Sequence, residues 1–386
     1  MLNFEMYLPT RLVFGKDTHK QIGNLLEGKA KKVLIHYGSE RIKSNGVFND
    51  VTRLLTEHGI EFLELGGVVP NPHVSLVRKG IEICRANGVD FILAIGGGSI
   101  IDSAKAIAMG VMYEGDVWEI FEGKVKVTKA LPLGTILTIP AAGSEMSPNT
   151  VITNEEEGFK WGFGCDAIRS KVSIINPEFF FTLPEDQIAY GVADMISHIF
   201  ERYFTQTLNT ALTDALCEAT LRTIIEKAPK LMKNPRDYDA WAEIGFAGTV
   251  AHNDILGKGR VQDWATHGIE HELSAAYDIA HGCGLAILTP AWMRYVKNEN
   301  IARFEAFARN VMGVEDVDTA IDKLSEFYRV MNLPQKLSEI DIDDSRFEEM
   351  ASKAELGSKA RYGTEYLGNF KKLYKHDILN ILELAK

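Results

Sequence analysis

The first half of the chain alternates short apolar runs with amphipathic segments, and this alternation constrains the fold more than any other feature. The runs predicted to be strands are short and largely apolar: 32–37, 61–65, 91–95 and 135–139. The segments predicted to be helices lie between them: 47–58, 74–87 and 100–109. Apolar strands separated by helices predict a parallel sheet with helices on both faces. Such sheets bind ligands at the carboxyl ends of their strands.

The pattern changes near residue 182. Beyond this point the chain is a succession of helical periods with few strand-like runs. Pro184, followed by Glu185 and Asp186, is typical of a first helical turn, where acidic side chains face the positive end of the helix dipole. We therefore expect an α/β domain over 1–183 and an all-helical domain over 184–386.

Composition restricts the function classes. The net charge of −11 and the absence of a basic block disfavour nucleic acid and anionic membranes as partners. The four cysteines form no CxxC pair, which is typical of reduced thiols. The start of the chain lacks a signal-peptide pattern, and no apolar run reaches the roughly 20 residues that span a bilayer. These features predict a cytoplasmic protein.

Two turns rich in small residues follow predicted strands. The first, Gly96 to Ser99, opens a helix, so its backbone can approach a phosphate without any Cβ in the way. Ser99 is expected to be the N-cap of that helix, with Asp102 completing a capping box. The second turn is Pro140 to Ser147. A tight turn without a ligand is the alternative for either one, but together they favour a nucleotide site.

The residues after the 32–37 strand bear on the coenzyme. An enzyme that prefers NAD often has a carboxylate here to accept the ribose hydroxyls. This chain has Gly38 and Ser39 instead, and Ser39, Arg41 and Lys43 could hold a 2′-phosphate. The pattern therefore favours NADP(H) over NAD(H), unless Glu40 turns inward.

Five potential metal ligands lie in the second half. Asp194 and His198 are four residues apart in a helical segment and share a face, and His267 and His271 repeat this spacing. His281 follows a predicted helix break near residues 277–278. One oxygen and three nitrogens suit Fe(II), Zn(II) or Co(II). Each histidine alone is more often a core residue. Together, the four histidines and Asp194 exceed the four groups that a site needs, and the spare histidine could relay a proton.

Several motifs in a fixed order resemble the iron-containing alcohol dehydrogenases, the group III metal-dependent family, and within it the butanol dehydrogenase branch. The resemblance covers nearly the whole chain. The matching motifs are Phe14-Gly15, PNP at 70–72, GGGSxxDxAK at 96–105, the AAGSE turn at 141–145, GVADMISHIFERY at 191–203 and HGIEHELSAAYDIAHG at 267–282. The family often has DALTHAIE where this chain has DMISHIFE, so the ligands are kept while residues facing the substrate differ.

The resemblance implies a Rossmann-like dinucleotide-binding domain followed by a helical metal-binding domain, as in dehydroquinate synthase-like architectures. It implies Asp194, His198, His267 and His281 as metal ligands, with His271 as an unligated proton relay. The cofactor-binding residues that it implies are Gly38, Ser39, Asn71, Gly97, Gly98, Ser99, Asp102, Thr138, Ser144, Ser147 and Lys160. Fe(II) is the expected metal, with Zn(II) as the alternative, and a homodimer is expected.

The implied reaction is hydride transfer between the nicotinamide and the carbonyl carbon of a short to medium aldehyde, with butanol and related primary alcohols as the reduced substrates. A glycerol dehydrogenase-like polyol oxidoreductase and a dehydroquinate synthase-like enzyme are close alternatives. A metal-dependent hydrolase and a nucleotide-binding sensor without catalysis are alternatives from other classes.

Overall fold

A computed structural model describes residues 1–44 and 46–386, apart from the side chains of residues 360–362. The chain forms two compact units, Tyr7–Thr182 and Leu183–Lys386, and residues Met1–Met6 belong to the second unit. The sequence prediction assigned these six residues to the first domain. They belong to the helical unit because of long-range contacts, among them the bond from Leu2 N–H to Gly259 O at 2.8 Å, which no local pattern indicates.

The α/β unit is built on a six-stranded parallel sheet with the order β1-β8-β5-β4-β2-β3, and a separate antiparallel hairpin pairs β6 with β7. The strands are β1 (Arg11–Phe14), β2 (Lys32–Tyr37), β3 (Glu61–Leu65), β4 (Phe91–Gly96), β5 (Leu133–Leu137), β6 (Asn149–Asn154), β7 (Phe159–Gly164) and β8 (Val172–Ile175). The predicted parallel sheet is confirmed.

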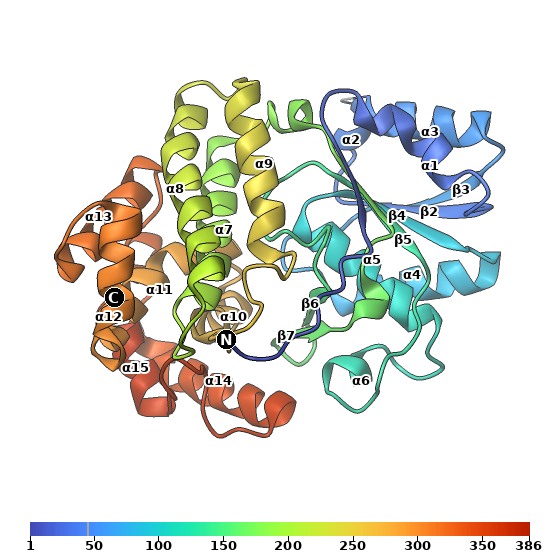
Figure 1. Cartoon of the computed structure of the whole chain (residues 1–386). Helices are drawn as coiled ribbons and strands as arrows, with labels where there is room; N and C mark the ends of the chain where they lie inside the picture. Colours follow the sequence, from blue (N-terminus) through green and yellow to red (C-terminus); the bar gives the residue numbers. More distant parts are fainter. Residues whose placement is uncertain (45) are drawn as a thin grey trace. The chain divides into compact units, whose positions relative to one another are not determined.

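Helices cover both faces of this sheet, with α1 and α3 on one face and α4 and α5 on the other (Figure 1). The helices of the unit are α1 (Ile22–Leu26), α2 (Arg41–Ser44), α3 (Val47–Glu57), α4 (Val74–Asn87), α5 (Gly98–Val111) and α6 (Trp118–Phe121). Alternation along β2 explains the two layers. Val33 and Ile35 join the apolar cluster beneath α1 and α3, whereas His36 faces the opposite way and bonds Ser103 of α5.

Two local expectations need correction. The strand predicted at 135–139 is β5, which begins and ends two residues earlier because its register pairs Leu137 with Gly96 of β4. Helix α5 starts at Gly98 with Gly97 as its N-cap residue, so Ser99 lies inside the first turn and is not the cap.

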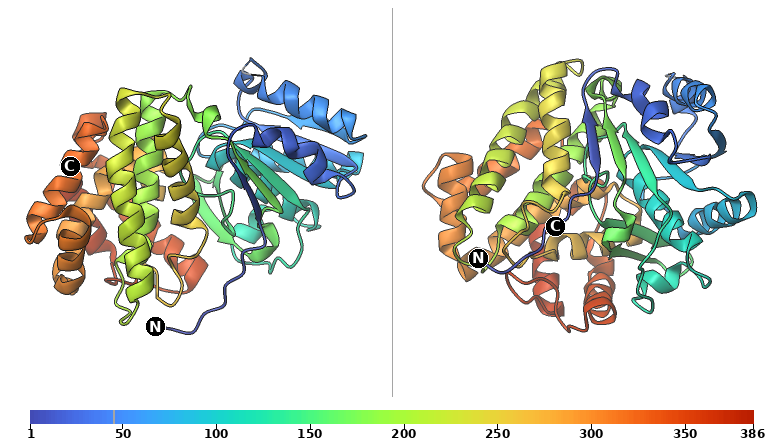
Figure 2. Two further views of the ribbon diagram at one scale, coloured as in Figure 1. Left: turned by 45° about the horizontal axis from the view of Figure 1, so that its top comes forward. Right: turned by 45° about the vertical axis from the view of Figure 1, so that its right-hand side comes forward.

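The second unit is all-helical, as expected. Its α-helices are α7 (Glu185–Tyr203), α8 (Ala211–Lys233), α9 (Tyr238–His252), α10 (Ala265–Tyr277), α11 (His281–Val296), α12 (Ile301–Phe307), α13 (Val317–Val330), α14 (Phe347–Tyr362) and α15 (Lys375–Ala385). Helix α7 packs against α8, α9, α10 and α11, and its residues from Gly191 to Tyr203 are all buried. Figure 2 shows α7, α8 and α9 running side by side as long rods. The polar side chains of α7 therefore lie inside the unit.

No helix in the described part of the chain is long and apolar enough to cross a membrane.

Candidate functional site

The α/β unit has its topological switch point between β2 and β4, since the chain passes from β2 to β3 on one side and returns to β4 on the other. Ligands of open parallel sheets bind at such a point, beyond the carboxyl ends of the strands. Gly38 follows β2 here, and Gly97 and Gly98 follow β4. A Cβ on Gly38 would lie 3.3 Å from Ile100 of α5, so the two strand ends are close together.

The two small-residue turns are in contact. A Cβ on Gly97 would lie 3.0 Å from that of Ile139, and a Cβ on Gly98 would lie 3.4 Å from that of Ala142. Thr138 N–H donates to Gly96 O at 3.1 Å and joins the ends of β4 and β5. The structure therefore brings the predicted phosphate-binding turns to one edge of the sheet.

Asp102 and Lys105 attach the second turn to α5. Asp102 accepts hydrogen bonds from Ser144 Oγ at 2.5 Å and from Val151 N–H at 2.9 Å, in place of the capping bond expected with Ser99. The buried Lys105 ammonium donates to the carbonyl oxygens of Ser144 (2.6 Å), Ser147 (3.0 Å) and Asn149 (2.7 Å). Lys105 is absent from the predicted site residues, although it lies in the same glycine-rich motif.

Asn71 and Lys160 approach this edge from a neighbouring loop and hairpin. Thr153 of β6 donates to Pro72 O at 2.8 Å and faces Lys160 of β7 across the hairpin, so the Asn71 loop and the lysine lie near one another. Asn71 is buried with a φ of 54° in front of a proline, where an extended backbone is favoured. Such strain is common at functional sites.

Two of the three residues expected to hold a 2′-phosphate, Arg41 and Lys43, are engaged elsewhere. Arg41 donates to Thr182 O at 2.5 Å. Lys43 pairs with Glu40 at 3.0 Å and with Glu64 at 2.8 Å, and its hydrogen bonds with these carboxylates raise its pKa. Ser39 is exposed and remains available.

The metal-ligand candidates come from three helices of the second unit. Asp194 and His198 lie on α7, His267 and His271 on α10, and His281 is the first residue of α11. The predicted helix break is confirmed, since α10 ends at Tyr277 and its C-cap residue Asp278 has a φ of 51°.

Asp194 Oδ1 is the centre of this group. It lies 2.9 Å from His198 Nδ1, 4.0 Å from His267 Nε2 and 3.9 Å from His281 Nε2. Ligand atoms around a tetrahedral ion with bonds of about 2.1 Å lie about 3.4 Å apart, so these separations suit one shared ion. Asp194, His267 and His281 offer atoms that are all mutually within 4.8 Å, whereas His198 contacts Asp194 and His267 but lies outside this closest group.

The electrostatics of the group favour a cation. Burial by itself would raise the pKa of Asp194, but the imidazoles of His198, His281 and His267 hold it well below its usual range. Burial, His198 and His281 lower the pKa of His267, so this imidazole is kept neutral. Within the described residues, the buried Asp194 Oδ1 accepts no hydrogen bond of normal geometry. A buried carboxylate beside the neutral imidazole of His267 is a favourable place for a further positive charge.

Two buried carboxylates complete the surroundings. Glu201 Oε1 lies 2.7 Å from His267 Nδ1, and Glu270 bonds His281 Nδ1. Neither glutamate is among the site residues expected from the sequence.

His271 is buried at the edge of the group. Its ring centroid lies 5.6 Å from that of His281 and 6.4 Å from that of His267. It also forms a second potential ligand cluster with Glu270 and His281. The geometry therefore brings His271 to the site and is compatible with either a free or a ligating imidazole.

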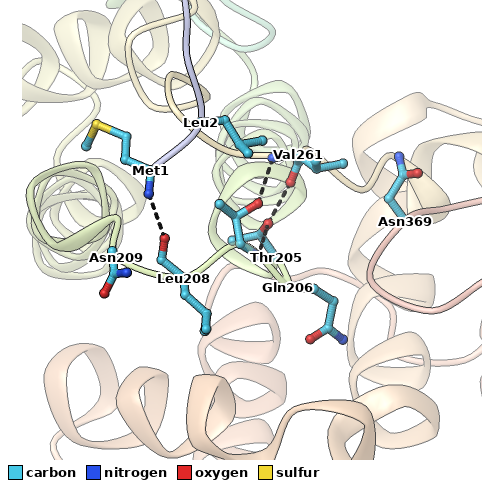
Figure 3. Close-up of a pocket in the computed structure, with 9 residues that line it drawn as sticks. Met1, Leu2, Thr205, Gln206, Leu208, Asn209, Val261 and Asn369 are labelled. Carbon is cyan, nitrogen blue, oxygen red and sulfur yellow. Dashed lines mark hydrogen bonds between the residues drawn. The ribbon is translucent and has the colours of Figure 1, made fainter.

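A separate pocket of about 480 Å³ lies in the helical unit (Figure 3). Its lining combines the start of the chain, Met1 and Leu2, with the segment from Thr205 to Asn209, and Met1 donates to Leu208 O at 3.0 Å. Among the described residues that line it there is no candidate metal ligand or cofactor residue.

Comparison with known proteins gives the family. The family model described as iron-containing alcohol dehydrogenase matches residues 9–177, and that of the Fe-containing alcohol dehydrogenase family, C-terminal, matches residues 188–386. The chain belongs to the iron-containing alcohol dehydrogenase family. It is therefore an oxidoreductase, and membership implies a metal ion and a nicotinamide cofactor.

Individual relatives support the butanol dehydrogenase branch of this family. The chain is 45% identical to the probable NADH-dependent butanol dehydrogenase 2 of Bacillus subtilis, with 100% of both chains covered. It is 33% identical to an NADPH-dependent aldehyde reductase of Escherichia coli, with 95% of this chain and 96% of the relative covered. The crystal structure of NADH-dependent butanol dehydrogenase A from Thermotoga maritima superposes with a TM-score of 0.97 at 41% identity, covering 100% of this chain and 99% of that chain.

Proposed function

We propose that this member of the family catalyses reversible hydride transfer between a nicotinamide coenzyme and short to medium aldehydes, with butanal and butanol as representative substrates. The observation that carries this proposal is the buried Asp194 Oδ1 surrounded by three imidazole nitrogens, in a chain whose other unit has a dinucleotide-type switch point. The names of the relatives support the choice of substrate.

The metal would be held by Asp194, His198, His267 and His281, with Fe(II) favoured over Zn(II). When bound, such an ion acts as a Lewis acid that polarises a carbonyl oxygen. Burial and the neighbouring imidazoles keep the His267 imidazole neutral, and the nearby imidazoles keep the Asp194 carboxylate ionised, so both can donate electron pairs to a metal. His271, beside His281, would hold the proton that the alkoxide oxygen receives.

The coenzyme would be NADH rather than the NADP(H) that the sequence pattern favoured. Two observations support this reversal. Lys43 is neutralised by Glu40 and Glu64, and Arg41 is bonded to a backbone carbonyl, so neither is free for a 2′-phosphate. The Bacillus relative with the higher identity is named as NADH-dependent, whereas the more distant aldehyde reductase is named as NADPH-dependent.

The test is the oxidation of coenzyme by butanal, followed at 340 nm with Fe(II)-reconstituted protein. NADH and NADPH are compared in parallel, each with a chelator control. We expect chelator-sensitive oxidation that is faster with NADH. Faster oxidation of NADPH would keep the reaction and overturn the coenzyme proposal. Oxidation of the coenzyme with glycerol-derived aldehydes, but not with butanal, would point to a polyol oxidoreductase. Phosphate release without a change in absorbance at 340 nm would point to a hydrolase.

A further inference from the structure

Two of the three helices that carry metal-ligand candidates, α7 and α10, contain the same four-residue motif. It is His198-Ile-Phe-Glu201 on α7 and His267-Gly-Ile-Glu270 on α10, so each histidine is followed three residues later by a glutamate. Residues three apart in a helix share a face. Both glutamates are buried, Glu270 completely. A buried carboxylate beside a metal-ligand candidate needs donors to offset its desolvation.

Glu201 meets its donors on the next ligand helix. Its Oε1 accepts from His267 Nδ1 at 2.7 Å, from the backbone N–H of His267 at 3.1 Å and from Thr266 Oγ1. Its Oε2 accepts from Trp264 N–H at 2.6 Å. The carboxylate of α7 thus binds the first turn of α10 together with the imidazole that α10 contributes.

Glu270 repeats this arrangement one helix further on. Its Oε2 accepts from Nδ1 of His281, the first residue of α11, and its Oε1 accepts from Ser274 Oγ. A Cβ on Gly284 of α11 would lie 2.9 Å from the Glu270 side chain, so the two helices are in close contact here. Each glutamate therefore accepts a hydrogen bond from the histidine of the following helix.

We propose that Glu201 and Glu270 are positioning residues that orient His267 and His281 for metal binding. A carboxylate can only accept, so Nδ1 of each imidazole carries the proton and Nε2 keeps its lone pair. Both Nε2 atoms face Asp194, at 4.0 and 3.9 Å. The glutamates thereby fix the tautomer and the direction of two ligands and increase their basicity. This inference rests on the proposed metal site.

The test measures metal affinity and not turnover. Glu201→Gln and Glu270→Gln would be titrated with Co(II) in competition with a chromophoric chelator, with the Co(II) absorption bands recorded. Each substitution is expected to weaken binding by roughly 10- to 100-fold and to alter the bands, because partners of this kind contribute such factors. NADH affinity should stay at the wild-type value.

Glu218→Gln is the matched control. Glu218 is also a buried glutamate of this unit, on α8, but it accepts from Tyr203 Oη at 2.8 Å and from Asn310 Nδ2 at 2.9 Å instead of from a histidine. This variant is expected to lose stability while keeping Co(II) affinity and bands. If Glu201→Gln and Glu270→Gln only lower the melting temperature, as this control does, the proposal is overturned.

A double-mutant cycle tests whether each glutamate acts through its assigned histidine. In a His281→Ala background, Glu270→Gln should cause no further loss of Co(II) affinity, whereas Glu201→Gln should still weaken binding by about tenfold or more. Equal further losses from both would overturn the pairing. Failure of the wild-type protein to bind Co(II), Zn(II) or Fe(II) would instead contradict the proposed function, so the two failures are distinguishable.

Discussion

His271 is the residue whose role depends most on small differences in position. It lies within reach of His281 and Glu270, yet it is absent from the closest group around Asp194. An imidazole that is not bound to metal can hold and release a proton near neutral pH, whereas a ligated one cannot. Whether His271 is a proton relay or a metal ligand therefore depends on the position of its own side chain.

We expect His271→Ala to keep the metal and to lower kcat by roughly 10²- to 10⁴-fold, the usual contribution of a general acid. His267→Ala should lose the metal and nearly all activity while NADH binding persists. Elemental analysis measures the metal content of the two variants, and steady-state kinetics measures their activity. Loss of metal in His271→Ala with retention in His281→Ala would reverse the two roles.

At the scale of elements, α7 and α11 approach closely beside the metal-ligand candidates. A Cβ on Gly282 would lie 2.1 Å from the backbone oxygen of Tyr190 on α7. Because the overlap is with a backbone atom, it can be relieved only if the helices move. Gly282 also follows His281 directly. The small residue lets α11 bring its first turn, and with it the candidate ligand His281, against α7.

Gly282→Ala should therefore cost about 1–3 kcal/mol of unfolding free energy, as overpacking typically does, and should weaken metal binding by displacing His281. Gly162→Ala is the control, because its Cβ would lie 3.6 Å from the nearest atom. Chemical denaturation and Co(II) titration compare the two. Retention of wild-type stability and affinity in Gly282→Ala would show that the helices do not require this contact.

Strand β2, which lies between β4 and β3, carries a buried histidine that makes the folded state sensitive to acid. Burial lowers the pKa of His36 from 6.5 to about 4, while its bonds to Leu65 O and Ser103 Oγ hold it in place. Above pH 6.5 the His36 imidazole is neutral in both the folded and the unfolded state. As the pH falls from 6.5 to 4, the unfolded chain binds a proton that the folded state does not, so stability is lost.

The expected loss from His36 is about 3 kcal/mol over that window, at about 1.4 kcal/mol per pH unit. His36→Gln removes the titration. The difference in unfolding free energy between wild type and variant should therefore shrink by this amount between pH 7 and pH 4, measured by urea denaturation. Parallel pH curves for the two proteins would contradict the assignment.

At the scale of the whole molecule, the two proposed ligand sites lie in different compact units. The metal-ligand candidates belong to Leu183–Lys386 and the cofactor turns to Tyr7–Thr182. A ligand stabilises the structure that binds it, by about 2.7 kcal/mol at a concentration of 100 times Kd. Metal and coenzyme should therefore protect different parts of the chain.

Metal removal should increase amide hydrogen exchange in α7, α10 and α11 while leaving β2 and β4 unchanged. NADH should instead slow exchange at the turn between β4 and α5. Mass spectrometry of peptides from the metal-loaded, chelator-treated and NADH-bound protein measures both effects. An equal response of both units to the chelator would indicate that the metal is not confined to the helical unit.

Sequence periodicity predicted the longer elements well, because burial on one face imposes a regular pattern. The helix predicted at 74–87 is α4, and the strand predicted at 32–37 is β2. The short strands β1 and β8 were not predicted, since four residues are too few to show a period. They are strands because pairing in the parallel sheet satisfies their backbone groups.

By itself, the sequence determined the layer architecture, the glycine-rich turns and the donor atoms of the metal-ligand candidates, because these depend on residue type and local spacing. Tertiary structure alone decided which partners they meet. Glu201 lies 66 residues from His267, and Lys105 lies 39 residues from Ser144. Helix packing brings the Glu201 carboxylate to Nδ1 of His267, and strand order brings the Lys105 ammonium to the turn that contains Ser144. No local sequence pattern encodes contacts over such separations.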